Sequence, residues 1–188
     1  MLSSIDNINI LELGSGTSLP SLACLMYSNK IVSVITDINK TYDLRSKIIE
    51  INKKNFKGKY LNLNLDWQRY EDKINVIDKF KTLAIESINN NNNNKCNGCE
   101  YYFNYIICSE LIYIDELSDS LINTLVFFSS KNKTKVILTY RERLPEQVKL
   151  FLDKFSKYFV YNFYYEDNKE LKKFEYKKKM YVIEASLK

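Results

Sequence analysis

Residues 10–17 read Ile10-Leu11-Glu12-Leu13-Gly14-Ser15-Gly16-Thr17, and this stretch decides the fold. An apolar run ends in an acid and two closely spaced glycines, and a helix-like pattern follows. This order is typical of a parallel strand entering a turn that passes close to a bound nucleotide, where a Cβ atom would not fit. A second acid, Asp37, ends the next strand-like run about twenty residues later, where a ribose-binding carboxylate is expected. The first half of the chain therefore predicts a nucleotide-cofactor site.

Apolar runs alternate with helix-period stretches along the chain, which is the pattern of a mostly parallel sheet covered on both faces. Strands are expected at residues 8–13, 31–36, 60–63, 105–108 and 136–139, and helices at 19–27, 40–54, 116–128 and from 145 onward. Two final strands, 159–165 and 180–185, follow one another without a helix, so we expect a C-terminal antiparallel hairpin at the sheet edge. The prediction is an α/β fold, a single Rossmann-like, seven-stranded, three-layer domain that spans residues 1–188.

Three local patterns add detail to this outline. Ser18 is expected to cap the first helix, with Pro20 in its first turn. In the second helix, Leu44, Ile48 and Ile51 recur at helical spacing and predict the buried face. Residues 89–99 begin with a run of asparagines that cannot bury a core face, so we expect a mobile insertion there.

The composition excludes several kinds of chemistry. The 188 residues include no histidine, which rules out Ser-His-Asp and Cys-His nucleophiles and any histidine zinc ligand. Cys96 and Cys99 have the spacing of half a zinc site but no second pair, so we interpret them as an incidental loop and expect no metal. Cys24 and Cys108 fall in helix and strand patterns and are expected to be reduced core thiols.

Charge and hydropathy limit the partners. The net charge is +5, but 23 acids are interspersed among 28 bases, which disfavours a nucleic-acid partner. The one dense lysine cluster, residues 172–179, is interpreted as a solvated hairpin. No run of about twenty apolar residues and no signal-peptide pattern occurs, so we expect no membrane association and a cytoplasmic location.

The glycine turn fits two common nucleotide classes incompletely. A dinucleotide fingerprint needs a third glycine where Leu19 stands, and a Walker loop needs a lysine where Thr17 follows Gly16. Glu12 would repel a diphosphate but suits a cationic amino acid. S-adenosylmethionine carries an ammonium, a sulfonium and a ribose. It is therefore the predicted cofactor, with S-adenosylhomocysteine as the product.

Four motifs together resemble the class I, seven-β-strand methyltransferases, and methyltransferase family 16 within that class. They occur in the family's order and are Leu11-Glu12-Leu13-Gly14-Ser15-Gly16-Thr17, Thr36-Asp37, Leu65-Asp66-Trp67 and Ser109-Glu110-Leu111-Ile112-Tyr113. That family contains protein-lysine methyltransferases, including those that act on valosin-containing protein and on heat-shock chaperones. The resemblance implies a protein substrate, such as a chaperone, an ATPase or a translation factor, that is methylated on a lysine side chain.

The resemblance also implies roles for individual residues. The glycine turn would pass under the methionine portion of the cofactor, Asp37 would accept hydrogen bonds from both ribose hydroxyls, and Trp67 would flank the adenine. The full set of implied cofactor-binding residues is Glu12, Gly14, Ser15, Gly16, Thr17, Asp37, Asp66, Trp67 and Ser109. Plainer interpretations stay open: Asp37 as a helix cap, Trp67 as core, and Glu12 as an ordinary strand-end acid.

Glu110 and Tyr113 are the candidate catalytic residues, because they follow the fourth strand at the edge where parallel sheets bind ligands. A lysine nucleophile must be neutral, although its free pKa is about 10.4. Our hypothesis is that Glu110 orients the incoming lysine and helps to remove its proton, while Tyr113 forms a wall of the channel. The alternative is that Glu110 is a helix-start acid and Tyr113 a packed aromatic.

Two other function classes remain open at this point. The first is a small-molecule or RNA methyltransferase, although residues 109–113 lack the paired prolines that enzymes methylating nucleic-acid amino groups usually carry. The second is a non-catalytic cofactor-binding module of the same fold. Family members carry a further segment before the first strand that covers the cofactor. The first strand is expected within the first few residues here, so we expect either a truncated chain or a domain without this cover.

Overall fold

The computed structural model describes residues 7–89, 102–112, 115–141, 144–164 and 180–188. Several predictions lie outside these residues. They concern Tyr113, the Cys96 and Cys99 pair, most of the asparagine-rich segment, and the lysine cluster.

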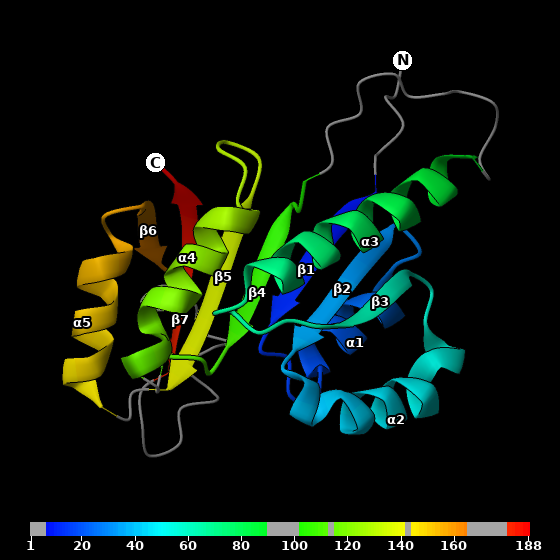
Figure 1. The fold of residues 1–188 in the computed structure, drawn as a ribbon, viewed down its shortest axis with the longest axis horizontal. Coiled ribbons are helices and arrows are strands. Elements are labelled where there is room, and N and C mark those ends of the chain that lie inside the picture. Colours follow the sequence, from blue (N-terminus) through cyan, green and yellow to red (C-terminus); the bar gives the residue numbers. More distant parts are fainter. Residues whose placement is uncertain (1–6, 90–101, 113–114, 142–143, 165–179) are drawn as a thin grey trace.

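Seven strands form one sheet in the order β3-β2-β1-β4-β5-β7-β6 (Figure 1). The strands are β1 (Ile8–Leu13), β2 (Ile31–Asp37), β3 (Lys59–Asn64), β4 (Tyr105–Ser109), β5 (Lys135–Arg141), β6 (Phe159–Phe163) and β7 (Met180–Leu187). Strand β7 lies between β5 and β6 and is antiparallel to both, while the pairings among β1 to β5 are parallel. The predicted seven-stranded, mostly parallel sheet with a C-terminal antiparallel hairpin is confirmed.

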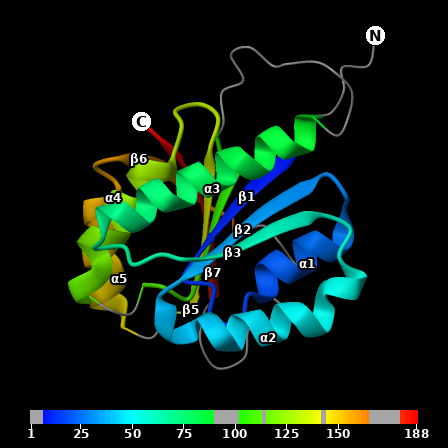
Figure 2. The ribbon, with the colours of Figure 1, turned by 45° about the vertical axis from the view of Figure 1, so that its right-hand side comes forward.

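Helices cover both faces of the sheet and complete the three layers (Figure 2). They are α1 (Leu19–Tyr27), α2 (Tyr42–Asn52), α3 (Tyr70–Asn89), α4 (Ser118–Phe128) and α5 (Pro145–Phe155), with short 3-10 turns at Asn39–Thr41, Lys53–Asn55 and Asp115–Leu117. The larger core cluster packs α3, α4 and α5 on one face, and a smaller cluster packs α1 and α2 on the other.

Helix α3 is absent from the sequence-based prediction. Its buried positions include Lys73, Val76 and Phe80, so a lysine occupies part of the inward stripe. The segment nevertheless carries apolar residues at helical spacing, and Val76, Ile77, Phe80 and Leu83 pack in or against the larger core cluster. This amphipathic pattern could have been found in the sequence.

The inward face of α2 follows the predicted spacing only in part, since Ile48 packs against the smaller core cluster. Leu44 and Ile51 are 52% and 72% exposed, whereas Arg45 and Ile49 are buried at 0% and 3%. The helix is rotated so that the Arg45 guanidinium finds hydrogen-bond acceptors on neighbouring segments, which leaves the two aliphatic residues facing outward.

The predicted cap at the start of α1 is also wrong. Ser18 makes no side-chain cap hydrogen bond and adopts a left-handed backbone with φ +63°. Its N–H donates to the Ser15 carbonyl at 2.6 Å, and its carbonyl accepts from the Leu22 N–H at 3.0 Å. The tight turn from β1 into α1 sets this backbone conformation, and Pro20 lies in the first turn of the helix as predicted.

Cys24 and Cys108 are free thiols, as expected. Within the described ranges, none of the helices combines the length and the apolar character that crossing a membrane requires.

Candidate functional site

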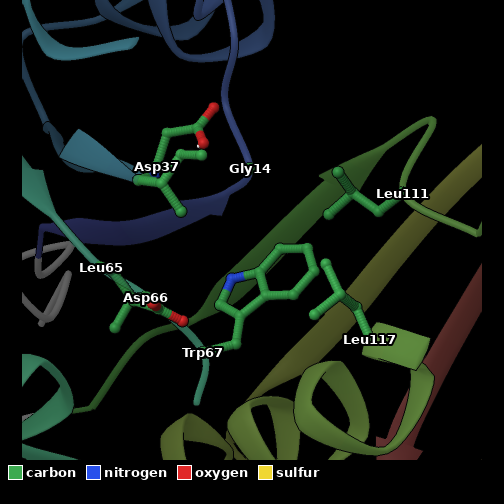
Figure 3. A pocket seen from close by; sticks show the side chains of 8 residues that line it. Gly14, Asp37, Leu65, Asp66, Trp67, Leu111 and Leu117 are labelled. Atoms are coloured by element: carbon green, nitrogen blue, oxygen red, sulfur yellow. Dashed lines mark hydrogen bonds between the residues drawn. The ribbon is translucent and has the colours of Figure 1, made fainter. Parts of the chain in front are cut away.

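A pocket lies at the carboxyl ends of the central strands, where the chain leaves β1 toward one side of the sheet and β4 toward the other. Such a switch point is the usual ligand site of open parallel sheets. The pocket is open to solvent and holds a cavity of about 150 Å³. Its lining residues are Gly14, Asp37, Ile38, Leu65, Asp66, Trp67, Leu111 and Leu117 (Figure 3).

The turn after β1 presents bare backbone to this pocket. Gly14 and Gly16 have φ values of +57° and +51°, which favour glycine over any other residue. A Cβ atom on Gly14 would lie 2.5 Å from a methyl carbon of Leu111 and 3.2 Å from a ring carbon of Trp67. A side chain at position 14 would require Leu111 to move, and the positive φ would add strain.

The same turn is fastened to the end of β2. The Ser15 N–H donates to the Thr36 carbonyl at 3.0 Å, and the Gly16 N–H donates to Asp37 Oδ2 at 2.7 Å. The Ile38 N–H donates to Asp37 Oδ1 at 2.7 Å. Each carboxylate oxygen keeps a second lone pair for a ligand. These contacts hold Asp37 at the pocket, and the 3-10 turn that follows begins without a side-chain cap.

Trp67 and Asp66 form the opposite wall. Figure 3 shows the indole beside Leu111 and Leu117, with Asp37 across the pocket. The Trp67 carbonyl accepts a 3.4 Å hydrogen bond from Thr124 of α4, and its ring also packs against the larger core. Trp67 therefore packs against the core and also lines the pocket.

Glu12 does not line the pocket. Its carboxyl group is 1% exposed, and Oε2 accepts a hydrogen bond from the Ser21 N–H at 3.2 Å, beneath the start of α1. Burial raises the pKa of Glu12 to about 7, against the smaller opposing effect of the Ser21 hydrogen bonds. The structure thus places this acid behind the glycine turn.

Glu110 directly follows β4 with a left-handed backbone, φ +59°, and its N–H donates to the Thr139 carbonyl at 2.8 Å. A non-glycine residue in this conformation is uncommon and occurs more often at functional sites. Ser109 accepts a 3.2 Å hydrogen bond from the Thr139 hydroxyl, which joins β4 to β5. The candidate residues that do not line the pocket are Glu12, Ser15, Gly16, Thr17, Ser109 and Glu110, while Tyr113 lies outside the described residues.

The sequence analysis does not identify four apolar lining residues, which are Ile38, Leu65, Leu111 and Leu117. Three of them adjoin predicted site residues: Ile38 follows Asp37, Leu65 precedes Asp66, and Leu111 follows Glu110. That adjacency is a usable signal, because residues just past strand ends meet at one edge of a parallel sheet. The sequence indicates Leu117 only as part of the apolar face of the expected helix 116–128. Among the described residues, no group of three or more Cys, Asp or Glu side chains is arranged to hold a metal ion.

The seven-stranded sheet with helices on both faces is a fold that this chain shares with solved methyltransferases. Residues 2–80, somewhat less than half of the chain, match the family of lysine methyltransferases. No curated protein sequence matches this chain.

Solved structures agree on the fold. The CurJ carbon methyltransferase superposes with a TM-score of 0.59 at 14% identity, covering 98% of this chain and 50% of its own. A predicted O-methyltransferase from Agrobacterium tumefaciens gives 0.59 at 12% identity, covering 100% of this chain and 77% of its own. The N-methyltransferase NodS from Bradyrhizobium japonicum, in complex with S-adenosylhomocysteine, gives 0.53 at 9% identity, with 99% and 80% covered. The chain thus spans half the length of the first of these proteins. Sequence identities of 9–14% show a shared fold only.

Proposed function

We propose that this protein is an S-adenosylmethionine-dependent methyltransferase that methylates a lysine side chain of a protein substrate. The observation that carries the proposal is the meeting of Gly14, Asp37 and Trp67, from three separate strand ends, in one pocket. The match of residues 2–80 to the lysine methyltransferase family supports the reaction and the type of acceptor.

The pocket fits the parts of this cofactor. The Asp37 carboxylate suits two ribose hydroxyls, and the Trp67 indole suits an adenine ring. The eight lining residues include two acids and neither lysine nor arginine, which suits a cationic ligand better than a diphosphate. The fold neighbour NodS was solved with S-adenosylhomocysteine, the product of such a reaction.

When bound, the cofactor supplies a methyl group that its sulfonium has already activated. The protein's main task is then to align a neutral amine and to exclude water. A partly buried lysine has a lowered pKa, which favours the neutral form. We assign Glu110 to orienting this amine and accepting its proton, because it follows β4 and adjoins Leu111 of the pocket wall. Its left-handed backbone supports a functional role. Tyr113 is proposed as a wall of the same channel.

Ligand binding tests the cofactor. The chain has one tryptophan, Trp67, and it lines the pocket, so its fluorescence should report occupancy. S-adenosylmethionine and S-adenosylhomocysteine should each change this fluorescence and raise Tm, whereas NAD should do neither. Stabilisation by NAD alone would overturn the cofactor assignment.

Methyl transfer tests the acceptor. The protein is incubated with a cell extract and S-adenosylmethionine labelled in its methyl group, and the product is divided between protease and nuclease treatments. We expect protease-sensitive label and methyl-lysine after acid hydrolysis. Label that survives protease and is lost with nuclease would point to RNA, and label confined to small molecules would also refute the protein acceptor.

The role of Glu110 is tested by Glu110→Ala, which should abolish transfer while leaving S-adenosylhomocysteine affinity within about threefold, because the carboxylate acts on the acceptor. The matched control is Asp153→Ala, which removes an exposed carboxylate from α5 and should leave both activities unchanged. Loss of cofactor binding in Glu110→Ala, or retention of transfer, would contradict the assignment.

A further inference from the structure

Arg45 on α2 is a fully buried cation, at 0% exposure. Burying a charge is costly unless hydrogen bonds replace its hydration. An aliphatic residue would fill such a position at lower cost, as Ile49 does one turn later on the same helix. The guanidinium therefore requires an explanation beyond the packing of α2.

The hydrogen bonds of Arg45 reach two separate segments. Nη1 donates to the Ile38 carbonyl at 3.3 Å and to the Thr41 hydroxyl, both in the segment after β2. Toward β3, Nε donates to Asn62 Oδ1 at 2.9 Å, and Nη2 donates to the Leu63 carbonyl at 3.0 Å and Asn64 Oδ1 at 3.4 Å. One planar side chain thus bridges the ends of two neighbouring strands.

Both segments continue directly into the pocket wall. Ile38 is itself a lining residue and follows Asp37, while Asn64 precedes the lining residues 65–67. A backbone bond from the Leu65 N–H to the Asp37 carbonyl at 2.9 Å joins the same two segments. Arg45 adds its bonds on the inner side of this junction, out of contact with solvent.

Charge alone does not explain the position of Arg45. The five acceptors are carbonyl, amide and hydroxyl oxygens, and none is a carboxylate. Burial lowers the pKa of Arg45, and the field of Asp37 opposes that change. The fixed fork of a guanidinium satisfies several acceptors at set angles, which a lysine cannot do.

We propose that Arg45 is a positioning residue for cofactor binding, which sets the spacing between the Asp37–Ile38 side and the Asp66–Trp67 side of the pocket. The inference rests on the proposed function. Arg45 should affect binding of the adenosine part of the cofactor, because ribose and adenine are the parts proposed to contact these two walls. A ligand held between both walls loses affinity when their spacing is no longer fixed.

The test compares Arg45→Met and Arg45→Lys with the control Ile49→Ala. Methionine keeps the apolar stem, lysine keeps the charge, and Ile49→Ala leaves a cavity in the same helix face without touching the bridge. The probes are S-adenosylhomocysteine and 5′-methylthioadenosine, which has the adenosine but no amino acid. Calorimetry gives the affinities, and urea unfolding gives the stability of each variant.

Both Arg45 variants should lose affinity for both probes by the same factor, on the order of tenfold, because the defect lies on the adenosine side. Lysine should fail to rescue, since it lacks the fork. The control Ile49→Ala should be destabilised yet bind both probes within about twofold of wild type. If Arg45 had only a structural role, its variants should likewise lose stability without losing affinity. If the Arg45 variants do not fold, Thr41→Val removes one acceptor of the bridge and should weaken both probes about threefold.

The outcomes separate the two claims. A wild-type protein that binds neither probe overturns the proposed function, and this inference with it. If wild type binds both probes and folded Arg45 variants bind them with unchanged affinity, the inference alone is overturned. Where those variants do not fold, unchanged affinity in Thr41→Val overturns it. A loss for S-adenosylhomocysteine without a loss for 5′-methylthioadenosine also overturns it, because the defect would then lie at the amino-acid end.

Discussion

Glu12 carries a carboxyl group with almost no access to water, and its protonation should therefore couple to folding. Burial raises its pKa from an ordinary value of 4.5 to about 7. Between pH 4.5 and about 7, the folded protein binds the proton of the Glu12 carboxyl group more tightly than the unfolded chain does. The contribution of Glu12 to stability is therefore fully present below pH 4.5 and is lost as pH rises to about 7.

Glu12→Gln should remove this pH dependence. The free energy of unfolding of the variant relative to wild type should increase by roughly 3 kcal/mol between pH 4.5 and 7, whatever its absolute stability. Urea unfolding at a series of pH values measures the difference. Glu146→Gln, the same change at an exposed carboxyl group, serves as the control. A curve for Glu12→Gln parallel to wild type would show that Glu12 titrates normally.

Residues of the site differ in how far the sequence reveals them. Asp37 and Trp67 were predictable, because each follows a strand and the ends of parallel strands converge. Arg45 was not, because its partners are acceptors on β3, and only the tertiary structure brings them to α2. Glu12 was singled out for its charge, and nothing in the sequence indicated that its carboxyl group would turn toward Ser21.

At the scale of elements, helix α1 begins on a strained residue. Ser18 has φ +63° and is fully buried, in a conformation that costs an L-residue about 1 kcal/mol relative to glycine. The resemblance to family 16 implies a glycine at this position. The hydrogen bond from the Ser18 N–H to the Ser15 carbonyl needs no side chain and would be kept by glycine.

Ser18→Gly relieves this strain but adds chain entropy and loses the 3.4 Å hydrogen bond from the Ser18 hydroxyl to Ser15 Oγ, so the free energy of unfolding should rise by at most about 0.5 kcal/mol. Urea or thermal unfolding gives the value. The neighbouring variant Thr17→Gly is the control: Thr17 is exposed and not among the residues with positive φ, so glycine there should be neutral or destabilising. Equal destabilisation by both variants would mean that Ser18 stores no strain.

Element boundaries were predictable where the buried pattern is continuous. The bounds expected for β1 and α1 match the structure, because nearly unbroken apolar runs and a first-turn proline mark them. Helix α3 was missed although its apolar residues recur at helical spacing. In α2 a long cationic side chain, Arg45, occupies an inward position that periodicity assigns to an apolar residue.

At the scale of the whole molecule, the strand order brings the parts of the site together. Strands β1 and β4 are neighbours in the sheet, although about ninety residues separate them in sequence, so the turns after both face one pocket. The alternation of strand and helix predicted a mostly parallel sheet, and the structure shows which strands are neighbours in it. The exact place of β7 between β5 and β6 required the structure, because a hairpin pattern does not specify which of its strands is the inner one.

This topology predicts where a ligand should slow amide hydrogen exchange. S-adenosylhomocysteine should protect the amides of Gly16, Ile38 and Trp67 on the order of tenfold, because local opening of these turns would require release of the ligand. Amides of β6 that exchange by local fraying should change little, since β6 lies at the far edge of the sheet from the pocket.

Exchange measured with and without ligand, in wild type and in Gly14→Ala, distinguishes the pocket from other binding modes. Gly14→Ala places a Cβ against Leu111 and Trp67 at a positive φ, so it should remove the protection while the sheet stays folded. Equal slowing of all amides would indicate global stabilisation without a localised contact. Protection centred on β6 and β7, and retained in Gly14→Ala, would place the ligand at the opposite edge of the sheet and contradict the site.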